Sequence, residues 1–460
     1  MNQDDVFTPC TNSSFYSPYG LEATAPIFGN SLPLPSPLGQ IFASFKLFER
    51  LPIIDRVSMI GLLYAMLDFD RDEETIKAYD RMNAHDLFVK FRLSKRLVED
   101  FIKPTLLVGL FKSPEDLSAA VVMELLYFYA LKKQNSFDVK WIKSKSISQT
   151  IIYPILSKLQ KDYGLQVEGN SKVSKLILNN ENKISSIEYT KDGKQEVIDD
   201  IDAVCLAVGA SGLKGILNSS PEISFLSPEL TKAASLNSVS CISARIWLDR
   251  KIKTRSPANV FSRFPSLRGS GGTFFMLDQL QKETKLELWG GDEANMQNSV
   301  VACDFYNSAA LMSLSSEDII NILMNDLLPS AVPEFKSAKV VDFHVVKYKD
   351  AVSWFSPGSY ECRPSTLNND IANLVMAGDW VKLDRELESK MAKGLCQERA
   401  LVTGIKAANA LIEKGIFDNN KISEIISIRP DEPQVVIGKL INKRIMDTLK
   451  PFGLSSPWVR

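Results

Sequence analysis

The residues in this sequence that are best placed to do chemistry lie between positions 373 and 412. A short apolar strand is predicted to run into Ala377-Gly378-Asp379-Trp380, and a charged loop then leads to a helix. A glycine at the end of a strand lets the backbone approach a ligand closely, and the carboxylate of Asp379 can accept hydrogen bonds from ligand hydroxyl groups. The pattern predicts a ligand site, although an ordinary strand–loop–helix element with small residues at a crossing explains the spacing equally well.

The helix predicted after this loop supplies a second binding feature. Its N-terminus, near Gln397–Ala400, would present free N–H groups and the positive end of the helix dipole to an electron-rich ring edge. Gly404, Ala407 and Ala408 keep one side of the helix slim, so that it can pack closely on a sheet or a cofactor. Apolar residues at helical spacing define one face: Leu401, Ile405, Ala408 and Leu411 or Ile412.

This segment resembles the C-terminal FAD-binding motif of the flavin amine oxidase and phytoene desaturase superfamily, in which an AGD strand precedes an EGA–SG–AA helix. The resemblance implies that Asp379 binds the ribityl chain or an adjoining hydroxyl group of FAD. It also implies that the backbone near Glu398 and Arg399 faces the pyrimidine edge of the flavin, with Arg399 standing where the family usually has glycine. The motif is matched at Gly378, Asp379, Glu398, Ala400, Thr403, Gly404, Ala407 and Ala408, and the expected FAD contacts here are Gly378, Asp379, Trp380, Glu398, Arg399 and Ala400.

Three further segments resemble the same superfamily in the same order, so that the resemblance covers residues 6 to 412. VEGNSKVSKLIL resembles the strand whose valine backbone holds the adenine, which gives that role to Val173. DIDAVCLAVGASGLKGIL resembles the DAVVLAVP strand and the turn after it, at Asp202–Gly209. WFSPGSY, residues 354–360, resembles the loop that closes over the flavin, which makes Trp354, Phe355 and Tyr360 candidates for its face.

One part of the family pattern is missing from the sequence. The family begins with a strand and a G-x-G-x-x-G helix that binds the FAD diphosphate, and nothing upstream of residue 100 matches it. The glycines at 209, 212 and 215 follow the wrong strand, and those at 269, 271 and 272 are expected in a loop. We therefore expect the first βαβ unit to be absent, through an incomplete gene model (the favoured explanation), a partner polypeptide, or loss of FAD binding.

The element pattern predicts a mixed α/β (α+β) chain built from discontinuous pieces. The resemblance implies the FAD/NAD(P)-binding two-domain flavoprotein fold with discontinuous domains and its first βαβ unit missing. The short strands between 165 and 208 include a two-residue hairpin turn at Asp192-Gly193. The predicted units are an irregular N-terminal segment (1–40), a helical part of the substrate domain (41–150), an FAD-binding part (151–215), a strand-rich substrate part (216–340), a C-terminal FAD-binding part (341–412) and an amphipathic tail (413–460).

Several local patterns make predictions that a structure can check. Ser113-Pro114-Glu115-Asp116 is predicted to open a buried helix, and Ser315 with Asp318 to form a capping box at another helix start. The run AVCLAV, without alternation, predicts a strand buried on both faces. KLELW, residues 285–289, is predicted to be a strand.

Composition excludes several functions. With 54 basic and 55 acidic residues the chain has no basic field, so no nucleic-acid partner is expected. Six cysteines without a C-x-x-C pair predict buried thiols in a reducing compartment and no metal site, and two histidines argue against a histidine-based centre. The acidic N-terminus shows no targeting peptide, and an intracellular location is expected, with a plastid admitted by the resemblance.

The resemblance implies an FAD-dependent oxidoreductase, similar to carotenoid or isoprenoid desaturases or isomerases, that transfers hydride from a small apolar substrate to flavin. No catalytic residue is identified. Two alternatives stay open: a non-catalytic or truncated member that no longer binds FAD on its own, and an amine oxidase. Aromatic residues of the helical part either line a substrate channel or pack in the core: Phe88, Phe91, Phe101, Phe111, Tyr127, Phe128 and Tyr129.

The tail contains one amphipathic helix, with Val436, Leu440 and Ile441 on one side and basic residues elsewhere. Packing of this helix against the body is the favoured interpretation, and peripheral contact with a membrane surface is the alternative. The sequence does not indicate the oligomeric state, the electron acceptor or the substrate.

Overall fold

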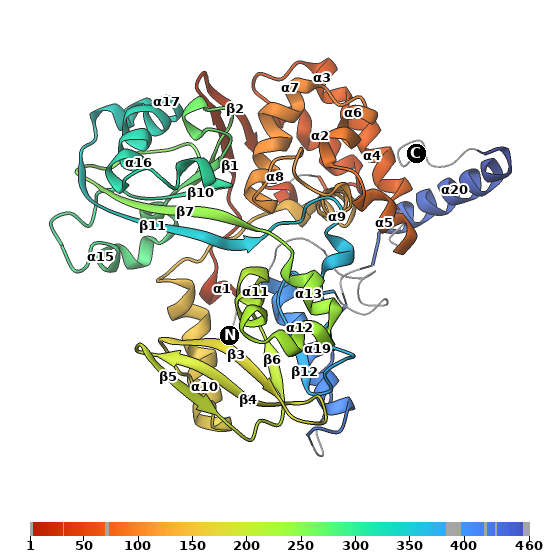
Figure 1. Cartoon of the computed structure of the whole chain (residues 1–460). Helices are drawn as coiled ribbons and strands as arrows, with labels where there is room; N and C mark the ends of the chain where they lie inside the picture. The colour runs from red at the N-terminus through yellow and green to blue at the C-terminus, as the bar shows by residue number, and fades with distance from the viewer. Residues whose placement is uncertain are drawn as a thin grey trace.

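The computed structural model describes residues 3–30, 32–69, 73–382, 397–417, 421–427 and 430–453. Figure 1 shows a lobe built on a large sheet, a block of helices beside it, and a lower lobe with smaller sheets. The chain passes from the upper part to the lower lobe, returns to the large sheet and enters the lower lobe again. Both the upper part and the lower lobe are therefore built from discontinuous segments, as the sequence predicts.

The large sheet has seven strands in the order β11-β7-β10-β9-β8-β1-β2, in which every pair is antiparallel except β1 with β8. Two predictions fail here. Residues 1–40 are not wholly irregular, because a hairpin within them forms the edge of this sheet. The strand that starts at Val340 pairs with β7 and so belongs to this sheet, not with the C-terminal FAD-binding part. The strands are β1 (Ser13–Ser17), β2 (Gly20–Ala25), β7 (Ser238–Leu248), β8 (Ala258–Phe261), β9 (Gly271–Met276), β10 (Val300–Tyr306) and β11 (Val340–Ser353).

Helices α16 (Ser316–Ile322) and α17 (Leu328–Ala331) cover one face of this sheet and share an apolar core with its strands. The predicted capping box at the start of α16 is confirmed. The Ser315 hydroxyl accepts the Asp318 N–H at 3.0 Å, and the Ser315 N–H donates to the Asp318 carboxylate at 3.2 Å. KLELW is not a strand: Lys285–Leu288 forms the short helix α15, which ends at two glycines with positive φ.

The helical block between the sheet and α20 confirms the helical character of residues 41–150. Its longest helix, α9, has eight buried residues and lies in the middle of the main core. The predicted start of α9 is wrong, because the helix begins at Ala119 and not at Ser113. The backbone of Ser118 instead pairs with Asn83 and donates its N–H to the Phe355 carbonyl, which keeps residue 118 out of the helix. The helices of this block are α2 (Leu38–Leu47), α3 (Ile53–Val57), α4 (Met59–Asp68), α5 (Glu73–Asp80), α6 (Ala84–Lys90), α7 (Lys95–Leu97), α8 (Lys103–Leu110) and α9 (Ala119–Leu131). Helix α1 (Gln3–Val6) lies apart from the block, near the lower lobe (Figure 1), and α14 (Leu277–Leu280) and α15 follow strand β9 in the chain.

The lower lobe contains two small sheets. An antiparallel sheet is formed by β3, β4 and β5, and positive φ at both Asp192 and Gly193 confirms the predicted hairpin turn. The second sheet pairs β6 and β12 in parallel. The elements are β3 (Ser171–Leu178), β4 (Ile184–Lys191), β5 (Lys194–Ile198), β6 (Val204–Leu206), β12 (Leu374–Met376), α10 (Tyr153–Tyr163), α11 (Ala210–Ser219), α12 (Pro221–Leu226), α13 (Pro228–Ala234) and α19 (Gln397–Glu413).

The parallel sheet is covered on one face only in part. Helix α19 packs over β12, where Ala407 and Leu411 share a small core with Val375. Over β6 the same face is open: Cys205 is exposed, whereas Val204 and Leu206 on the other face are buried. The predictions that AVCLAV is buried on both faces and that the thiols are buried are therefore wrong for Cys205.

Helix α20 (Pro433–Leu449) leaves the helical block and projects beyond it (Figure 1). It packs against α4 through Val435 and Asn442, which are buried. The stripe that the sequence favoured for this packing faces outward instead, with Leu440 and Ile441 more than half exposed at 56% and 55%. The structure confirms that the helix packs on the body and contradicts the prediction that this stripe makes the contact. No helix in the described part of the chain is long and apolar enough to cross a bilayer.

Asn373 joins the two sheets of the lower lobe, and its replacement tests how far the lobe depends on it. Its buried amide accepts the Ile184 N–H at 2.9 Å and donates to the Ile184 carbonyl at 2.8 Å. We expect Asn373→Ala to cost about 2–3 kcal/mol, because it leaves a buried donor and acceptor unpaired. A lower urea midpoint, followed by circular dichroism, checks this. Asn218→Ala on an exposed helix position is the control, and equal midpoints for the two variants would contradict the prediction.

Candidate functional site

The turn after β12 is shaped by one glycine. Gly378 has φ +134°, a conformation that other residues rarely adopt, and a Cβ there would lie 3.0 Å from the ring of Trp380. The hydroxyl of Thr403 on α19 accepts the Gly378 N–H at 2.9 Å and lies 3.0 Å from the Gly378 carbonyl oxygen. The hydroxyl group of Thr403 therefore holds the turn against the helix.

Asp379 lies next to two buried cations. Burial raises the pKa of its carboxyl group, and the charges of Arg399 and Arg363 oppose that rise. Arg399 is 0% exposed and donates from Nη2 to the Val381 carbonyl at 2.5 Å. The arginine at the family's glycine position thus folds into the protein, and its side chain does not stand out from the start of α19.

Arg363 stacks on the loop that follows β11. Its guanidinium carbon lies 4.0 Å from the centre of the Phe355 ring and 5.8 Å from that of Tyr360. Phe355 is 1% exposed, and the indole N–H of Trp354 donates to the Asp116 carbonyl at 2.8 Å. The Arg363 side chain therefore covers the Phe355 ring, and the hydrogen bond of Trp354 holds the loop to the helical block.

Asp80, which the sequence does not single out, fastens this loop from the other side. Its buried carboxylate accepts the Ser118 hydroxyl at 2.5 Å and the Tyr360 N–H at 3.0 Å, and its carbonyl accepts the Gly358 N–H. Burial raises the pKa of Asp80. The residue lies at the end of an ordinary amphipathic helix, so its sequence context carries no signal of this role.

The structure brings most of the predicted FAD residues together and leaves one apart. Gly378, Asp379 and Trp380 form the turn, and Thr403 connects it to the first turn of α19, where the carbonyls of Arg399 and Ala400 lie 3.0 and 2.9 Å from the Thr403 hydroxyl. Glu398 is exposed at the start of that helix. Val173 lies in a different sheet, on β3, where it pairs with Tyr189.

The buried face of α19 differs from the face that the apolar spacing indicates. Ala407, Ala410 and Leu411 pack on β12, whereas Leu401 is 66% exposed and Ala408 is also exposed. The side of the helix that carries Leu401 and Ala408 therefore points away from the sheet.

These residues fit the ribityl and pyrimidine end of FAD. The glycine turn, the Asp379 carboxylate and the N-terminus of α19 lie together, and the buried indole N–H of Trp380 has no hydrogen-bond partner among the described residues. The glycines at 271 and 272 do not form a diphosphate loop. They open β9, and a Cβ at Gly271 would come within 2.6 Å of Leu107, so their role is close packing.

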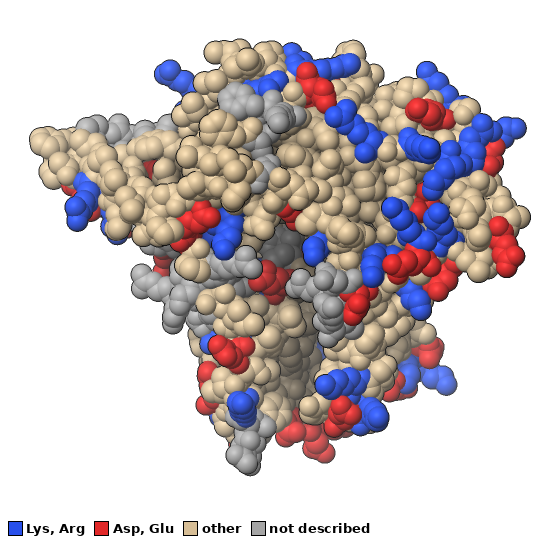
Figure 2. Space-filling model, turned by 180° about the vertical axis from the view of Figure 1, so that it is seen from behind, with Lys and Arg blue, Asp and Glu red and all other residues tan. Residues whose placement is uncertain are grey.

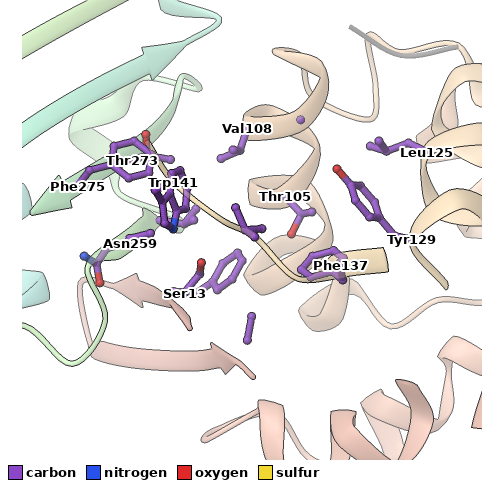
Figure 3. A pocket seen from close by; sticks show the side chains of 16 residues that line it. Ser13, Thr105, Val108, Leu125, Tyr129, Phe137, Trp141, Asn259, Thr273 and Phe275 are labelled. Atoms are coloured by element: carbon purple, nitrogen blue, oxygen red, sulfur yellow. The ribbon is translucent and has the colours of Figure 1, made fainter. Parts of the chain in front are cut away.

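A cavity of about 160 Å³ lies between the helical block and the large sheet (Figure 3). Tyr129 and Phe137 point into it from the helical side, and Phe275 and Trp141 from the sheet side. Its walls are aliphatic and aromatic apart from hydroxyl groups and one amide, Asn259, and the residues that line it include no charged side chain. This volume is below the ~300–1,000 Å³ typical of ligand pockets, so the cavity has room for only part of a ligand of that size.

Some of the aromatic residues named for the helical part line the cavity, and others pack in the core. Tyr129 lines the cavity, whereas Phe88, Phe91 and Tyr127 are buried in the main core. Helix α9 connects the cavity to the Asp80 junction. Ser118, just before the start of α9, donates its hydroxyl proton to Asp80, and Leu125, two turns further along the helix, lines the cavity. At 1.5 Å per residue these positions are about 10 Å apart along the helix axis.

Comparison with known sequences gives carotenoid enzymes among the relatives of this chain, although no family model matches it. It is 27% identical to the 15-cis-phytoene desaturase of Solanum lycopersicum over 84% of this chain and 61% of that protein. It is 26% identical to the enzyme of Glycine max over 83% and 61%, and 26% identical to the carotenoid phi-ring synthase of Streptomyces griseus over 46% and 37%. The chain thus spans about three fifths of the length of the desaturases it matches.

Solved structures with the same architecture are oxidoreductases. Cyclohexylamine oxidase from Brevibacterium oxydans superposes with a TM-score of 0.56 at 11% identity, covering 88% of this chain and 82% of that one. An oxidoreductase from Methanosarcina mazei gives 0.52 at 14% identity over 78% and 73%. These likenesses show the fold. Together with the sequence relatives they confirm the resemblance to the amine oxidase and phytoene desaturase superfamily and the two-domain flavoprotein fold.

The Thr403 hydroxyl can be tested by an isosteric change. Thr403→Val leaves the Gly378 N–H without its acceptor, and we expect a loss of about 1–3 kcal/mol in the free energy of unfolding. Hydrogen exchange of the Gly378 amide should accelerate in Thr403→Val and stay slow in Thr403→Ser, which keeps the hydroxyl. Equal exchange rates in the two variants would show that the hydroxyl does not hold the turn.

Proposed function

We propose that this chain is an FAD-dependent oxidoreductase that removes hydride from an apolar substrate of the carotenoid or isoprenoid class. The observation that carries the proposal is the uncharged cavity, which α9 connects to Asp80, where the loop that carries Arg363 is held. A polyene offers no charge for a protein to bind, so an apolar wall is what its recognition requires. The phytoene desaturases among the relatives support this substrate class.

The cofactor would be held at the turn and at the helix that follows it. FAD, when bound, supplies the hydride acceptor. The Asp379 carboxylate would accept hydrogen bonds from ribityl hydroxyl groups, and the backbone at Gly378 permits close approach. The first N–H groups of α19, near Glu398 and Ala400, would face the pyrimidine edge, where the helix dipole favours negative charge.

Arg399 adds a fixed charge to this arrangement. Because its guanidinium group is anchored on the Val381 carbonyl, the side chain leaves the start of α19 accessible. Its positive charge also favours the ionised form of Asp379, which is the form that accepts hydrogen bonds at both oxygens. An arginine at position 399, where the family has glycine, is therefore compatible with a cofactor site.

The alternatives make different demands on the cavity. An amine oxidase needs a polar or charged anchor for its substrate, and the residues that line this cavity supply none with a charge. The names of the desaturase relatives place those proteins in the chloroplast or chromoplast. As part of the proposal, this supports a plastid location for this chain.

FAD binding by the purified chain is the direct test of the cofactor. We expect added FAD to develop the absorption bands of bound flavin, and Asp379→Ala to weaken binding about 10- to 100-fold, since a hydrogen bond to a charged group contributes about 1.5–3 kcal/mol. Asp370→Ala, at an exposed aspartate of the same lobe, should bind FAD like the unaltered chain. A chain that retains no flavin bands after incubation with saturating FAD and removal of the free FAD by gel filtration would favour the non-binding alternative.

Filling the cavity tests the substrate class separately. Val108 lines the cavity, and Val108→Trp should lower turnover of 15-cis-phytoene at least tenfold while leaving the flavin spectrum unchanged, because the larger ring occupies the space for the polyene. Val89→Trp, at a position that is 62% exposed, is the matched control. Chromatography of the products measures turnover. Oxidation of cyclohexylamine with no reaction of phytoene would instead support the amine oxidase alternative.

A further inference from the structure

A group of polar side chains lies on the large sheet beside the cavity. Successive residues of a strand point to opposite faces of a sheet, and Cys303 and Phe305 of β10 face the core shared with α16. Asp304 and Tyr306 therefore lie on the opposite face. Thr273 of β9 pairs directly with Asp304 across the sheet and lines the cavity. The face that carries Asp304 is thus the face that borders the cavity.

Hydrogen bonds connect these side chains into one cluster. The hydroxyl oxygens of Thr273 and Tyr306 are 3.0 Å apart. The Ser243 hydroxyl, on β7, donates to the Asp304 carboxylate at 2.7 Å. The Cβ atoms of a directly opposed pair such as Thr273 and Asp304 lie about 4.5–5.5 Å apart. The carboxylate of this Asp304 cluster (Ser243, Thr273, Asp304 and Tyr306) is therefore one side chain away from the cavity wall.

The Asp304 cluster also adjoins the candidate flavin site. The ring of Phe111, just after α8, packs edge-on against the Tyr306 ring, with 4.9 Å between their centres. The next residue, Lys112, places its ammonium group 4.1 Å from the centre of the Trp354 ring. Trp354 belongs to the loop that stacks on Arg363 near the Gly378 turn. Two adjacent residues thus connect the cluster to that loop, while Thr273 connects it to the cavity.

Asp304 is the group in this cluster that can accept a proton. Burial raises the pKa of its carboxyl group, and the hydrogen bond from Ser243 and the charge of Arg245 oppose that rise. Burial also raises the pKa values of the Tyr306 and Cys241 side chains, and the Asp304 charge adds to both rises. The phenol and the thiol therefore stay protonated at neutral pH, which leaves the carboxylate as the base.

Desaturation needs a proton acceptor as well as a hydride acceptor. The hydride leaves one carbon with both electrons of its C–H bond and goes to FAD, which is reduced by two electrons. The adjacent carbon then loses a proton, and the electrons of that second C–H bond form the double bond. An apolar cavity stays dry, and the residues that line this one include no carboxylate and no histidine. A group beside the cavity is therefore needed to take the proton.

We propose that the Asp304 carboxylate accepts the proton that an apolar substrate loses when its double bond forms. The cavity has room for only part of a long substrate, so the remainder would extend along the sheet face past Thr273 to Asp304. Figure 2 shows a groove in the lower lobe that leads toward the upper part, which would admit the cofactor from the other side. Asp304 is only partly buried, so its carboxyl group would release the proton to water afterwards. This inference rests on the proposed function and adds a base to it.

Replacement of the carboxylate by an amide tests the proposal. Asp304→Asn keeps the shape of the side chain and an acceptor for the Ser243 hydroxyl, but it removes the base. We expect turnover of 15-cis-phytoene to fall at least about 100-fold with the flavin bands unchanged, because general bases contribute roughly 10²–10⁴-fold. Asp342→Asn, at an exposed aspartate of β11 in the same sheet, is the matched control. Equal turnover in the two variants would overturn the proposal.

The pH profile separates a base from a merely structural residue. The kcat/KM of the unaltered chain should fall at acidic pH, because the ionised carboxylate is lost as the pH drops through the pKa of Asp304. Since burial raises that pKa, the midpoint should lie above the usual value of a carboxyl group. The residual activity of Asp304→Asn should lack this acidic fall. An unchanged acidic fall in the variant would assign the proton to another group and count against Asp304.

A measurement without turnover decides the question if the purified chain holds no FAD. Isotope-edited infrared spectroscopy, with Asp304→Asn as the reference, gives the pKa of Asp304 in the cofactor-free chain. Saturation with 15-cis-phytoene should raise this pKa further, because the hydrocarbon displaces water from the carboxylate. A pKa that does not respond to phytoene would show that the carboxylate does not contact the substrate. Absent flavin bands or absent turnover in the unaltered chain would instead count against the proposed function and leave this measurement intact.

Discussion

The carboxylate of Asp80 is the interaction on which the arrangement of this molecule most depends. It accepts the hydroxyl of Ser118 and the N–H of Tyr360, so that α5, the start of α9 and the loop after β11 meet at one buried group. Hydrogen bonds to a buried charge are among the stronger polar interactions in proteins, and losing either partner would leave that charge poorly solvated. The loop carries Arg363, whose charge reaches Asp379. The hydrogen bonds that Asp80 accepts thus help to set the position of the candidate cofactor turn relative to the helical block.

The lower lobe is a less complete structure than the upper part. Parallel sheets are usually covered on both faces, yet β6 presents Cys205 to solvent, and α19 carries an exposed apolar residue, Leu401, on the side away from its sheet. Asn373 compensates locally, because its side chain bonds the backbone of the neighbouring sheet at Ile184. The lobe therefore holds its two sheets together through a side-chain bridge where a larger sheet would use further backbone pairing.

The sequence predicted the elements with strong local signals and missed those set by distant partners. The Asp192-Gly193 turn and the Ser315 capping box follow from the conformational preferences of adjacent residues, and both are confirmed. The start of α9 could not be located, because it is decided by backbone pairing of Ser118 with residues far along the chain. For the site, the AGD turn and α19 were found from a local motif, whereas Asp80 and Arg363 act through tertiary contacts that leave no periodicity or spacing to detect.

Two features of the molecule limit the chemistry that it can support. The cavity excludes charge from its lining, so binding there must rely on apolar surface, which is non-directional and fixes a substrate by shape. The polar groups are concentrated about the Gly378 turn, where Asp379, Arg363 and Arg399 interact and Thr403 holds the backbone. The uncharged cavity and the charged turn are thus separate, and α9 connects the cavity to the Asp80 junction. This separation suits a reaction in which the substrate contributes only a C–H bond and the cofactor carries the charge that develops.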